Sequence, residues 1–417
     1  MVKSEYKQTE IGMIPEDWDI KNAESFGEII TGSTPSTENS SFWNGDIPWI
    51  TPSDIKETRD IAKSDRMITK QGLSATRELP PFTLLVTCIA SIGKNAVLTQ
   101  KGSCNQQINA IIPSNEYSVN YLYYLMETNK EYLLANSGIT ATRIVSKNDF
   151  AKLMFAVPAT KREQECIAEA LSDVDSIISM LEKLVAKQKF IKRGAMQELL
   201  TGKKRLPGFS GTWKNYVFSE LFDFVPNNAF TRAQMSDSGK VKNIHYGDIL
   251  TKYGAYVDGS NDSIPYISKK VDLSRFADRC YLQSGDIIIA DTAEDETVGK
   301  ALEVINVNCP ILAGQHTLMC RPKIKFADKF LGYYLNAACY HDQLLPYIVG
   351  TKVSSVSKAS VAQTKLVVPE YEEQQAIAEI LSNMDAEIEA LEQKLEKYRQ
   401  VKQGMMQQLL TGKIRLV

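Results

Sequence analysis

Two stretches of this chain place amide and basic side chains in the same order. Gln106-Gln107 interrupts an otherwise apolar run, and Gln315-His316 does the same further along the chain. Arg143 and Lys352 each stand shortly before an apolar run that ends in Val-Pro. Amide and guanidinium groups can form paired hydrogen bonds with the edges of adenine and guanine, while lysine and hydroxyl groups suit phosphates. These residue types have the hydrogen-bonding chemistry that contacts to a nucleic acid would require.

The candidate DNA-contacting side chains fall into two sets, one from each stretch. Each of them alone is also consistent with an ordinary solvent-exposed polar group, and Gln106 and Gln315 are equally consistent with internal hydrogen bonds in a strand. Arg143 and Lys352 are the best matched pair, because both precede the closing strand of their stretch. The first set is Thr31, Ser33, Thr34, Lys94, Asn95, Gln106, Gln107, Arg143, Ser146 and Lys147, and the second is Arg232, Lys240, Lys242, Asn243, His245, Tyr246, Lys252, Tyr253, Gln315, His316, Lys352, Ser357 and Lys358.

Motifs for catalysis are missing from the sequence. It contains no Gly-x-x-x-x-Gly-Lys-Ser/Thr loop for nucleotides and no Gly-x-Gly-x-x-Gly for a cofactor pyrophosphate. It also lacks the Asn/Asp-Pro-Pro-aromatic tetrapeptide that amino-methyltransferases use to hold a target base. The three histidines, His245, His316 and His341, are not spaced as metal ligands. We therefore expect a non-catalytic protein with no metal and no cofactor of its own.

Composition is that of an ordinary globular protein. The chain has 417 residues, 43% of them hydrophobic and 24% charged, with a formal net charge of −2. The seven cysteines are scattered and contain no Cys-x-x-Cys pair, which favours reduced thiols and a cytoplasmic location. The first 18 residues have no apolar core typical of a signal peptide, and we expect no membrane span.

A long segment that follows each stretch occurs twice. Without a gap, Gln164 aligns with Gln374 and Asp175 with Asp385, an offset of 210 residues that continues to the Leu-Leu-Thr-Gly-Lys sequences at 199–203 and 409–413. Such a period is too long for a solenoid and indicates duplication of one module. In both copies, apolar residues recur at alternating intervals of mostly four and three, which predicts a coiled-coil helix about 40 residues long, or roughly 60 Å. The predicted seam consists of Ile167, Leu171, Val174, Ile178, Leu181, Val185, Gln188, Ile191 and Ala195 in the first copy, and Ile377, Leu381, Met384, Ile388, Leu391, Leu395, Tyr398, Val401 and Met405 in the second.

Charge order along the two helices predicts how they pair. Both copies are acidic in their first part and basic in their second part. Parallel pairing would place like charges together, whereas antiparallel pairing sets acid against base. We therefore predict an antiparallel pair, in which exposed ion pairs fix orientation more than stability. The basic run 183–193 either pairs with the other helix or contacts a DNA backbone.

The two globular stretches are weaker copies of each other. Each begins with a tryptophan after a polar lead-in, Trp18 or Trp213. The lead-in follows the first helix copy directly, but the N-terminus supplies it for the second, as expected of a circularly permuted repeat. We predict a mixed α/β fold with pseudo-twofold symmetry and with both termini together at one end of the helix pair. The predicted divisions are domains 1–158 and 207–369 and helices 159–206 and 370–417.

This organisation resembles the DNA-specificity (S) subunit of type I restriction–modification systems. The resemblance covers essentially the whole chain, and it is the order and duplication of the motifs that make it specific. They are Ile-Pro-Glu-Asp-Trp at 14–18, Thr-Gly-Ser-Thr-Pro at 31–35, the Ile-Pro-Trp-Ile run at 47–55, Asn-Gln-Gln-Ile-Asn-Ala at 105–110, Gly-Gln-His at 314–316 and the paired helix ends.

The resemblance implies a function and partners. Each domain would be a target-recognition domain that reads one half of an asymmetric, interrupted site in double-stranded DNA. The helices would fix the gap and dock two methyltransferase subunits, which bind S-adenosylmethionine, and a restriction subunit would join them. The two domains differ at most positions, so we expect two different half-sites. The alternative from the sequence is a coiled-coil scaffold or adaptor that does not read DNA.

Overall fold

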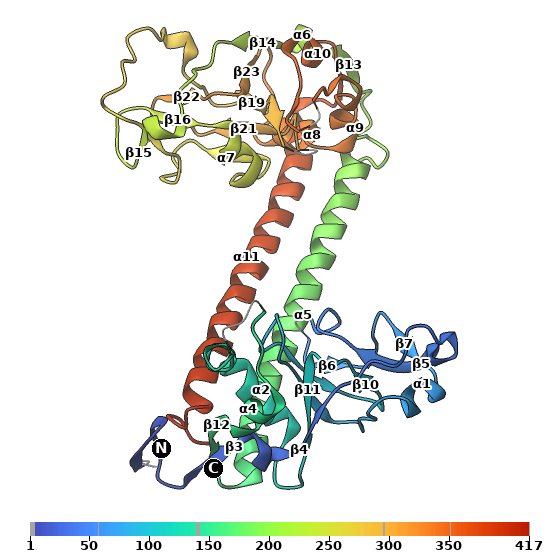
Figure 1. Cartoon of the computed structure of the whole chain (residues 1–417). Helices are drawn as coiled ribbons and strands as arrows, with labels where there is room; N and C mark the ends of the chain where they lie inside the picture. Colours follow the sequence, from blue (N-terminus) through green and yellow to red (C-terminus); the bar gives the residue numbers. More distant parts are fainter. Residues whose placement is uncertain (1–4, 57, 139–141, 295–296, 351, 417) are drawn as a thin grey trace. The chain divides into compact units, whose positions relative to one another are not determined.

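The structure divides into two compact units. The computed structural model describes residues 5–56, 58–138, 142–294, 297–350 and 352–416. Unit 1 comprises Met1–Glu182 and Gln393–Val417, and unit 2 comprises Lys183–Glu392. The two long helices, α5 (Lys161–Leu199) and α11 (Tyr371–Leu409), each give one part to each unit (Figure 1). The helices are thus shared between the units, and they end at Leu199 and Leu409.

A five-stranded sheet forms the centre of unit 1. Its strands lie in the order β4-β11-β8-β9-β6, all antiparallel except for the parallel β9–β6 pair. The middle strand, β8 (Thr83–Thr87), is buried at all five residues, as expected of a mostly apolar strand covered on both faces. The strands are β1 (Tyr6–Thr9), β2 (Gly12–Pro15), β3 (Trp18–Asn22), β4 (Gly27–Thr31), β5 (Trp43–Ile50), β6 (Asp60–Ile61), β7 (Met67–Ile68), β8 (Thr83–Thr87), β9 (Asn95–Leu98), β10 (Ser103–Cys104), β11 (Ile108–Pro113) and β12 (Met154–Pro158), with helices α1 (Lys70–Ser74), α2 (Val119–Thr128), α3 (Lys130–Ala135) and α4 (Lys147–Lys152).

Unit 2 repeats this sheet strand for strand. Its order is β14-β23-β19-β21-β17, again antiparallel except for the last pair. The strands are β13 (Lys214–Val217), β14 (Phe222–Val225), β15 (Met235–Ser236), β16 (Lys242–Ile244), β17 (Tyr256–Asp258), β18 (Tyr266–Ile267), β19 (Ile287–Ala290), β20 (Thr292–Ala293), β21 (Ala301–Ile305), β22 (Ile311–Ala313), β23 (Thr317–Pro322), β24 (Ser354–Ser355) and β25 (Lys365–Val368), with helices α6 (Phe218–Leu221), α7 (Tyr246–Thr251), α8 (Phe330–Leu335), α9 (Ala338–His341) and α10 (Lys358–Ala362).

A smaller sheet also recurs in both units. In unit 1 it is β10-β5-β7, and in unit 2 it is β15-β18-β16-β22. Each contains one parallel pair, β5 with β10 or β16 with β22, followed by the same backbone hydrogen bond. Asn105 N donates to Ile50 O over 2.9 Å, and Gly314 N donates to Ile244 O over 2.8 Å. The prediction of two similar mixed α/β domains is confirmed.

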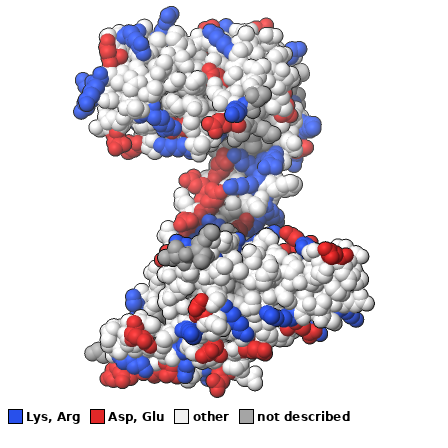
Figure 2. Space-filling view, viewed as in Figure 1, with Lys and Arg blue, Asp and Glu red and all other residues white. Residues whose placement is uncertain are grey.

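The helices run antiparallel within each unit. In unit 1, Arg399 Nη2 lies 2.7 Å from Glu182 Oε1, and Lys402 Nζ lies 2.6 Å from Asp175 Oδ1. In unit 2, Lys189 Nζ lies 2.7 Å from Glu392 Oε1, and Lys192 Nζ lies 2.5 Å from Asp385 Oδ1. In both units the residue number falls along α5 as it rises along α11, which confirms the predicted direction. Figure 2 shows the acidic and basic side chains that line the helices.

The predicted seam is buried along much, but not all, of its length. Leu171, Leu181, Val185, Ile388 and Leu395 are each no more than 8% exposed. Ile191 and Val401, which occupy equivalent places in the two copies, are instead 39% and 40% exposed. The prediction for these two residues is wrong. Since other apolar side chains of α5 are also exposed, Phe190 most of all at 74%, heptad position alone does not determine burial here.

Each globular part is attached to its helix by the same side chains. Tyr124 Oη donates to Asp175 over 2.7 Å, and Tyr333 Oη donates to Asp385 over 2.6 Å. Gln164 and its counterpart Gln374 each accept a backbone N–H from the globular part, over 3.0 and 3.1 Å. The duplication therefore extends to individual contacts.

The ends of the chain complete unit 1. Tyr6 Oη donates to the carbonyl of Gly412 over 3.3 Å, so the first and last described strands and turns meet there. Arg415 pairs with Glu163 and lies 5.8 Å from the ring of Trp18. In unit 2, where the chain is continuous, Arg205 pairs with Glu373 and lies 5.7 Å from Trp213. This match confirms the predicted circular permutation, and described residues near the two ends of the chain, Tyr6 and Gly412, lie together (Figure 1).

The described cysteines are all free, in agreement with the expected reduced thiols. No helix in the described part of the chain is long and apolar enough to cross a membrane.

Unit 2 buries a carboxylate in its main sheet. Glu303 is 1% exposed and accepts backbone N–H groups from Lys329 over 2.6 Å and from Gly332 over 2.8 Å, at the start of α8. Burial raises the pKa of Glu303 from 4.5 to about 7, and the two N–H donors oppose that rise.

This shift predicts a pH-dependent stability of unit 2. Because the folded state holds the proton more tightly, the contribution of Glu303 is fully present below pH 4.5 and is lost as the pH rises to about 7, a change of about 3 kcal/mol. Trp213 is the only tryptophan in the sequence of unit 2, so its fluorescence follows the unfolding of unit 2 in urea. We expect Glu303→Gln to gain about 3 kcal/mol relative to the parent protein between pH 5 and pH 8. An equal difference at both pH values would contradict this assignment.

Candidate nucleic-acid interface

Several residues of the first predicted set are brought together in unit 1 by the loop after β4 and the turn after β10. The loop after β4 lies against the turn after β10, because Ser33 N donates to Cys104 O over 2.8 Å. Thr34 Oγ1 donates to Gln106 Oε1 over 2.6 Å. Thr31 Oγ1 donates to Asn109 over 2.7 Å and is half-buried, so it supports this loop more than it faces solvent.

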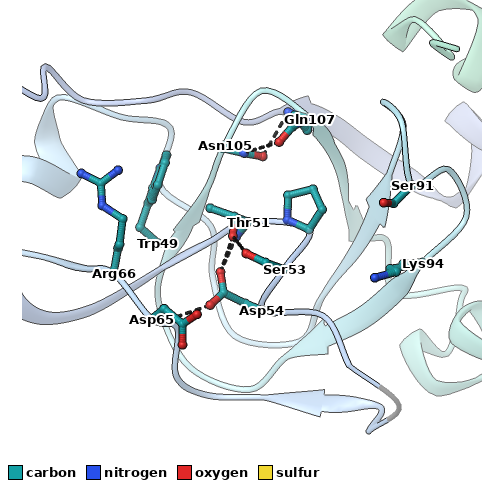
Figure 3. A pocket seen from close by; sticks show the side chains of 11 residues that line it. Trp49, Thr51, Ser53, Asp54, Asp65, Arg66, Ser91, Lys94, Asn105 and Gln107 are labelled. Carbon is teal, nitrogen blue, oxygen red and sulfur yellow. Dashed lines mark hydrogen bonds between the residues drawn. The ribbon is translucent and has the colours of Figure 1, made fainter. Parts of the chain in front are cut away.

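A cavity of about 670 Å³ opens beside these loops (Figure 3). On one side Asn105 Nδ2 donates to Gln107 Oε1 over 3.0 Å, which fixes both amides. The sequence predicted Gln107 and Lys94 as contacts, and both line this cavity. The lining residues are Trp49, Thr51, Pro52, Ser53, Asp54, Asp65, Arg66, Ser91, Lys94, Asn105 and Gln107.

The basic segment before the closing strand of unit 1 lies near this cavity. Arg143 accepts a hydrogen bond on its carbonyl oxygen from Ala90 N over 3.1 Å, next to Ser91 of the cavity lining. Its side chain is exposed. Ser146 caps α4 by accepting from Asp149 N over 3.2 Å, and Lys147 is the exposed first residue of that helix. The segment thus presents Arg143 and Lys147, whereas Ser146 is engaged in the cap.

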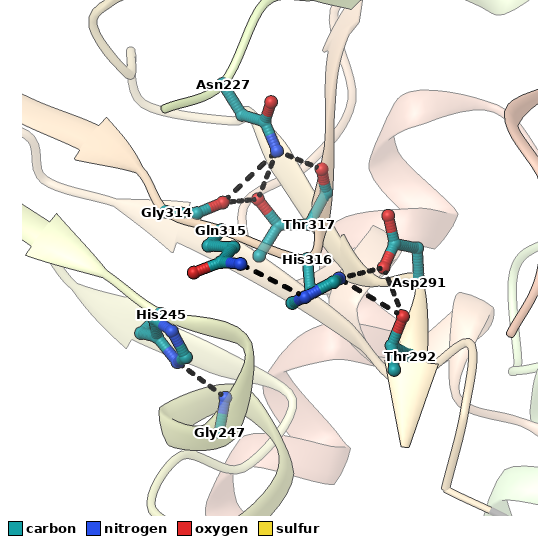
Figure 4. A network of polar contacts seen from close by, with 9 residues as sticks. All are labelled: Asn227, His245, Gly247, Asp291, Thr292, Gly314, Gln315, His316 and Thr317. Atoms are coloured by element: carbon teal, nitrogen blue, oxygen red, sulfur yellow. Dashed lines mark hydrogen bonds and ion pairs between the residues drawn. The ribbon is translucent and has the colours of Figure 1, made fainter. Parts of the chain in front are cut away.

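Part of the second set, Gln315 and His316 with the nearby His245 and Tyr246, lies in unit 2 around the turn between β22 and β23 (Figure 4). Asn227 Nδ2 donates to the carbonyl oxygens of Thr317 over 2.6 Å and Gly314 over 3.2 Å, and so closes the turn. His316 at its tip has a φ of 56° and remains exposed. Its ring lies 3.2 Å from the amide of Gln315.

Neighbouring elements supply further contacts to this turn. The Tyr246 ring packs against His316 at 5.3 Å and against His245 at 4.6 Å. Thr292 Oγ1 lies 3.4 Å from His316 Nδ1. Burial and the nearby Arg232 lower the pKa of His245, which caps α7 by accepting from Gly247 N over 3.3 Å. A neutral His245 is the form that such a cap requires.

The basic segment of unit 2 lies beside the same cluster. Strand β24 pairs with β20, which places Ser355 opposite Thr292. Lys352 is exposed, and Lys358 lies 4.7 Å from the ring of Phe224. Ser357 caps α10 by accepting from Ser360 N over 3.1 Å. Thr351, which belongs to the same segment, lies outside the described residues.

Comparison with known proteins decides the family. Residues 15–189 and 210–398 match the family described as the type I restriction modification DNA specificity domain, once in each half of the chain. The chain belongs to this family. Its two units are therefore DNA-specificity units, each with its own candidate interface.

Relatives and solved structures agree with this membership. The MjaIX specificity subunit of Methanocaldococcus jannaschii is 37% identical over 187 residues, but that match spans only 43% of either chain. The MjaVIII specificity subunit of the same organism is 23% identical over 97% of this chain and 94% of the relative. The type I S subunit structure from M. genitalium has a TM-score of 0.56 at 14% identity, over 94% of this chain and 96% of that one. It supports the fold alone.

Several predicted DNA contacts lie inside the specificity units. Asn95 is 2% exposed and donates to Glu127 over 2.6 Å. Lys242 is 3% exposed, and its ammonium group donates to the carbonyl oxygens of Gly259 and Asn261. Asn243 is fully buried. Among the described residues, Asn95 Oδ1 and Asn243 Nδ2 have no hydrogen-bond partner, but burial keeps all three side chains out of the interface.

Two other predicted residues of unit 2, Lys252 and Arg232, are at the surface but already have partners. The ammonium group of Lys252 donates to the carbonyl of Ser263. Arg232 lies 2.9 Å from the buried Asp248. Tyr253 is 8% exposed, whereas Lys240 is exposed. In α5, Lys189 and Lys192 pair with α11, which favours the helix-pairing alternative for those two lysines.

Sequence reasoning missed an arginine on two tryptophans in unit 1. The Arg66 guanidinium lies 3.7 Å from the ring centre of Trp43 and 5.3 Å from that of Trp49. The contact forms because β7 pairs with β5, with Met67 opposite Pro48. The two tryptophans in one strand-like run were the available signal, but only the strand pairing identifies the residue above them.

Proposed function

We propose that each unit reads one half of an asymmetric, interrupted site in double-stranded DNA. The observation that carries this proposal is that two units with the same frame present different side chains at equivalent places. The matching hydrogen bonds of Asn105 and Gly314 set the correspondence between the two turns. Unit 1 then has Asn105-Gln106-Gln107 where unit 2 has Gly314-Gln315-His316. Different donors and acceptors on one scaffold fit two different half-sites.

The loop after the small sheet gives a second contrast of this kind. Thr51-Pro52-Ser53 in unit 1 corresponds to His245-Tyr246-Gly247 in unit 2, and each is followed by Asp-Ile. Asp54 N donates to Thr51 O over 3.0 Å and Asp248 N donates to His245 O over 2.9 Å, so the turns are alike. The turn is retained while its side chains change from small polar groups to aromatic rings, of which His245 is buried and Tyr246 is half-buried.

Catalysis, in this proposal, belongs to partner subunits. Two methyltransferase subunits, one for each unit, would pack on the outer faces of α5 and α11 and bind S-adenosylmethionine. A restriction subunit would join the same assembly. Among the described residues, no group of three or more histidine, cysteine, aspartate or glutamate side chains is arranged to hold a metal ion.

A gel-shift experiment with the chain and its co-expressed methyltransferase tests the proposal. The target sequence is first read from the methylated sites of cells that carry the system. We expect salt-sensitive binding that survives competitor DNA only on the bipartite site. Binding with no sequence preference would favour the scaffold alternative.

The two basic segments predict separable effects on the half-sites. Arg143→Ala should weaken or relax recognition of one half-site only, and Lys352→Ala that of the other, because each exposed side chain lies on its own unit. For a contact to a base edge we expect a loss of about 10- to 100-fold. Competition with duplexes altered in one half-site measures both effects, and Ala substitution of the helix-cap residue Ser146 provides the control for local unfolding. A variant that harms both half-sites equally would argue against separate readers.

A further inference from the structure

The turn between β22 and β23 of unit 2 carries a histidine whose tautomer follows from its contacts. Thr292 Oγ1 donates its only O–H to Asp291 Oδ1 over 2.8 Å, so toward the ring of His316 this hydroxyl can only accept. His316 Nδ1 lies 3.4 Å from the hydroxyl oxygen and 3.7 Å from Asp291 Oδ1. Nδ1 therefore carries a proton, and in the uncharged ring Nε2 carries none.

This tautomer orients the neighbouring glutamine. Gln315 Nε2 lies 3.2 Å from His316 Nε2, where an N–H of the amide donates to the unprotonated ring nitrogen. Gln315 Oε1 points away from the ring (Figure 4), and none of the described residues donates a hydrogen bond to it. The amide thus offers a free acceptor together with its second N–H.

A second proton on His316 would reverse the amide. Histidine is the side chain that ordinarily changes its charge between pH 5 and pH 8. When Nε2 also carries a proton, two donors face each other across 3.2 Å, so the amide of Gln315 must turn and accept through Oε1. Only the N–H groups of the amide then remain free.

The charged and titratable groups around the ring come from two directions. Asp291 lies between β19 and β20, and Tyr246 in α7 packs on the ring of His316 at 5.3 Å. His245 packs on Tyr246 in turn, and the charge of Arg232 acts on His245. Burial lowers the pKa of His245, so this second histidine stays neutral to a lower pH than an ordinary one.

The equivalent glutamine of unit 1 is held the other way round. The correspondence of the two turns aligns Gln106 with Gln315. Thr34 Oγ1 donates to Gln106 Oε1 over 2.6 Å, which occupies the acceptor and leaves the N–H groups of this amide for other partners. The place of His316 is taken by Gln107, which cannot gain a proton in this pH range. The two units therefore present opposite ends of the same amide.

We propose that Gln315 reads an adenine in the half-site of unit 2, and that it does so only while His316 is uncharged. In that state Oε1 accepts from N6 and the second N–H donates to N7, the pair of hydrogen bonds by which glutamine recognises adenine. With a charged His316, Oε1 is occupied and the free N–H groups suit guanine, whose O6 and N7 both accept. Gln315 is the binding residue and His316 positions it. The proposal rests on the DNA-reading function proposed above and assigns one base to one side chain.

The test uses the complex of this chain with its co-expressed methyltransferase. Competition with duplexes in which each base pair of the bipartite site is replaced in turn gives the discrimination at every position, at pH 5 and at pH 8. Gln315→Met keeps the length of the side chain without its amide. His316→Gln gives unit 2 the glutamine pair of unit 1, with a neighbour that does not titrate. His245→Asn keeps a capping side chain on α7 and is the control for the other histidine.

For the parent complex we expect one A·T pair whose replacement by G·C costs about 10- to 100-fold at pH 8 and much less at pH 5. Gln315→Met should lose this discrimination at both pH values. His316→Gln should keep it at both, and His245→Asn should keep the pH dependence of the parent. Discrimination in the half-site of unit 1 should not change with pH.

The proposal is overturned if Gln315→Met relaxes no position or a pair other than A·T. It is also overturned if His316→Gln either loses the discrimination or retains the pH dependence, or if His245→Asn abolishes that dependence. An effect of acid on all positions alike would point to the overall stability of unit 2, for example through Glu303, and would equally contradict it. If the parent complex shows no preferred site at pH 8, the proposed function has failed instead.

Discussion

Replacing Arg415 with methionine is expected to destabilise unit 1 by about 3 to 5 kcal/mol. The guanidinium donates to both oxygens of Glu163 and, over 2.6 and 2.7 Å, to Asp17. Glu163 is 3% exposed, so loss of Arg415 leaves a buried carboxylate without its cation. These hydrogen bonds also raise the pKa of Arg415, which keeps it charged. Urea unfolding, combined with hydrogen exchange of the first turns of α5, measures the loss in unit 1.

A double variant distinguishes the loss of the ion pair between Arg415 and Glu163 from the cost of leaving the buried carboxylate of Glu163 without a partner. Glu163→Leu with Arg415→Met removes both ionised groups, and we expect it to recover most of the stability, because the penalty comes from the unpaired buried carboxylate. Unit 2 serves as the internal reference, since it has its own pair between Arg205 and Glu373. If the double variant is as unstable as the sum of the two single variants, the penalty has another origin.

The architecture could be predicted because its signals are periodic or repeated. A seam with alternating intervals of four and three residues, together with acidic and basic halves, specifies two helices and their direction from the sequence alone. Because the segment occurs twice, the seam and the charge order seen in one copy can be compared with those of the other. The pattern failed at Ile191 and Val401, because the heptad gives the phase of a helix and not the neighbours that cover a given turn.

The candidate site was predicted less well, because residue type does not tell which way a side chain points. Lys242 and Asn243 have the chemistry of DNA contacts, but they lie in β16, whose three residues are all buried. Gln107 and Lys94 line the cavity of unit 1, and Gln107 was singled out because it interrupts an apolar run. No pattern in the sequence around Arg66 singles it out, because its position depends on contact with Trp43, which is distant in sequence.

Lengthening both helices by one turn is expected to change the gap between the half-sites and leave the half-sites themselves unchanged. The ion pairs on each side of the unit boundaries show where this can be done. Unit 1 pairs residues up to Glu182 with residues beyond Gln393, and unit 2 pairs Lys189 with Glu392. Four helix-forming residues inserted after Glu182 and four after Glu392 therefore keep the internal contacts of both units.

The expected size of the change follows from helix geometry. Four residues add about 6 Å, and B-DNA rises about 3.4 Å per base pair, so the gap should lengthen by about one to two base pairs. Sequencing of methylated sites in cells that carry the variant measures it directly. Affinity for the original site should fall toward non-specific binding, by roughly 1,000-fold or more.

Insertion in one helix alone provides the control. Four extra residues after Glu182 would move α5 past α11 by about one turn, so that pairs such as Lys192 with Asp385 could not form together with those of unit 1. We expect this variant to lose DNA binding instead of acquiring a new gap. Altered half-sites with an unchanged gap in the doubly lengthened protein would show that the helices do not measure the distance. Because the ion pairs of each unit involve only its own parts of the two helices, a new gap with intact half-sites would identify the helix pair as the element that sets it.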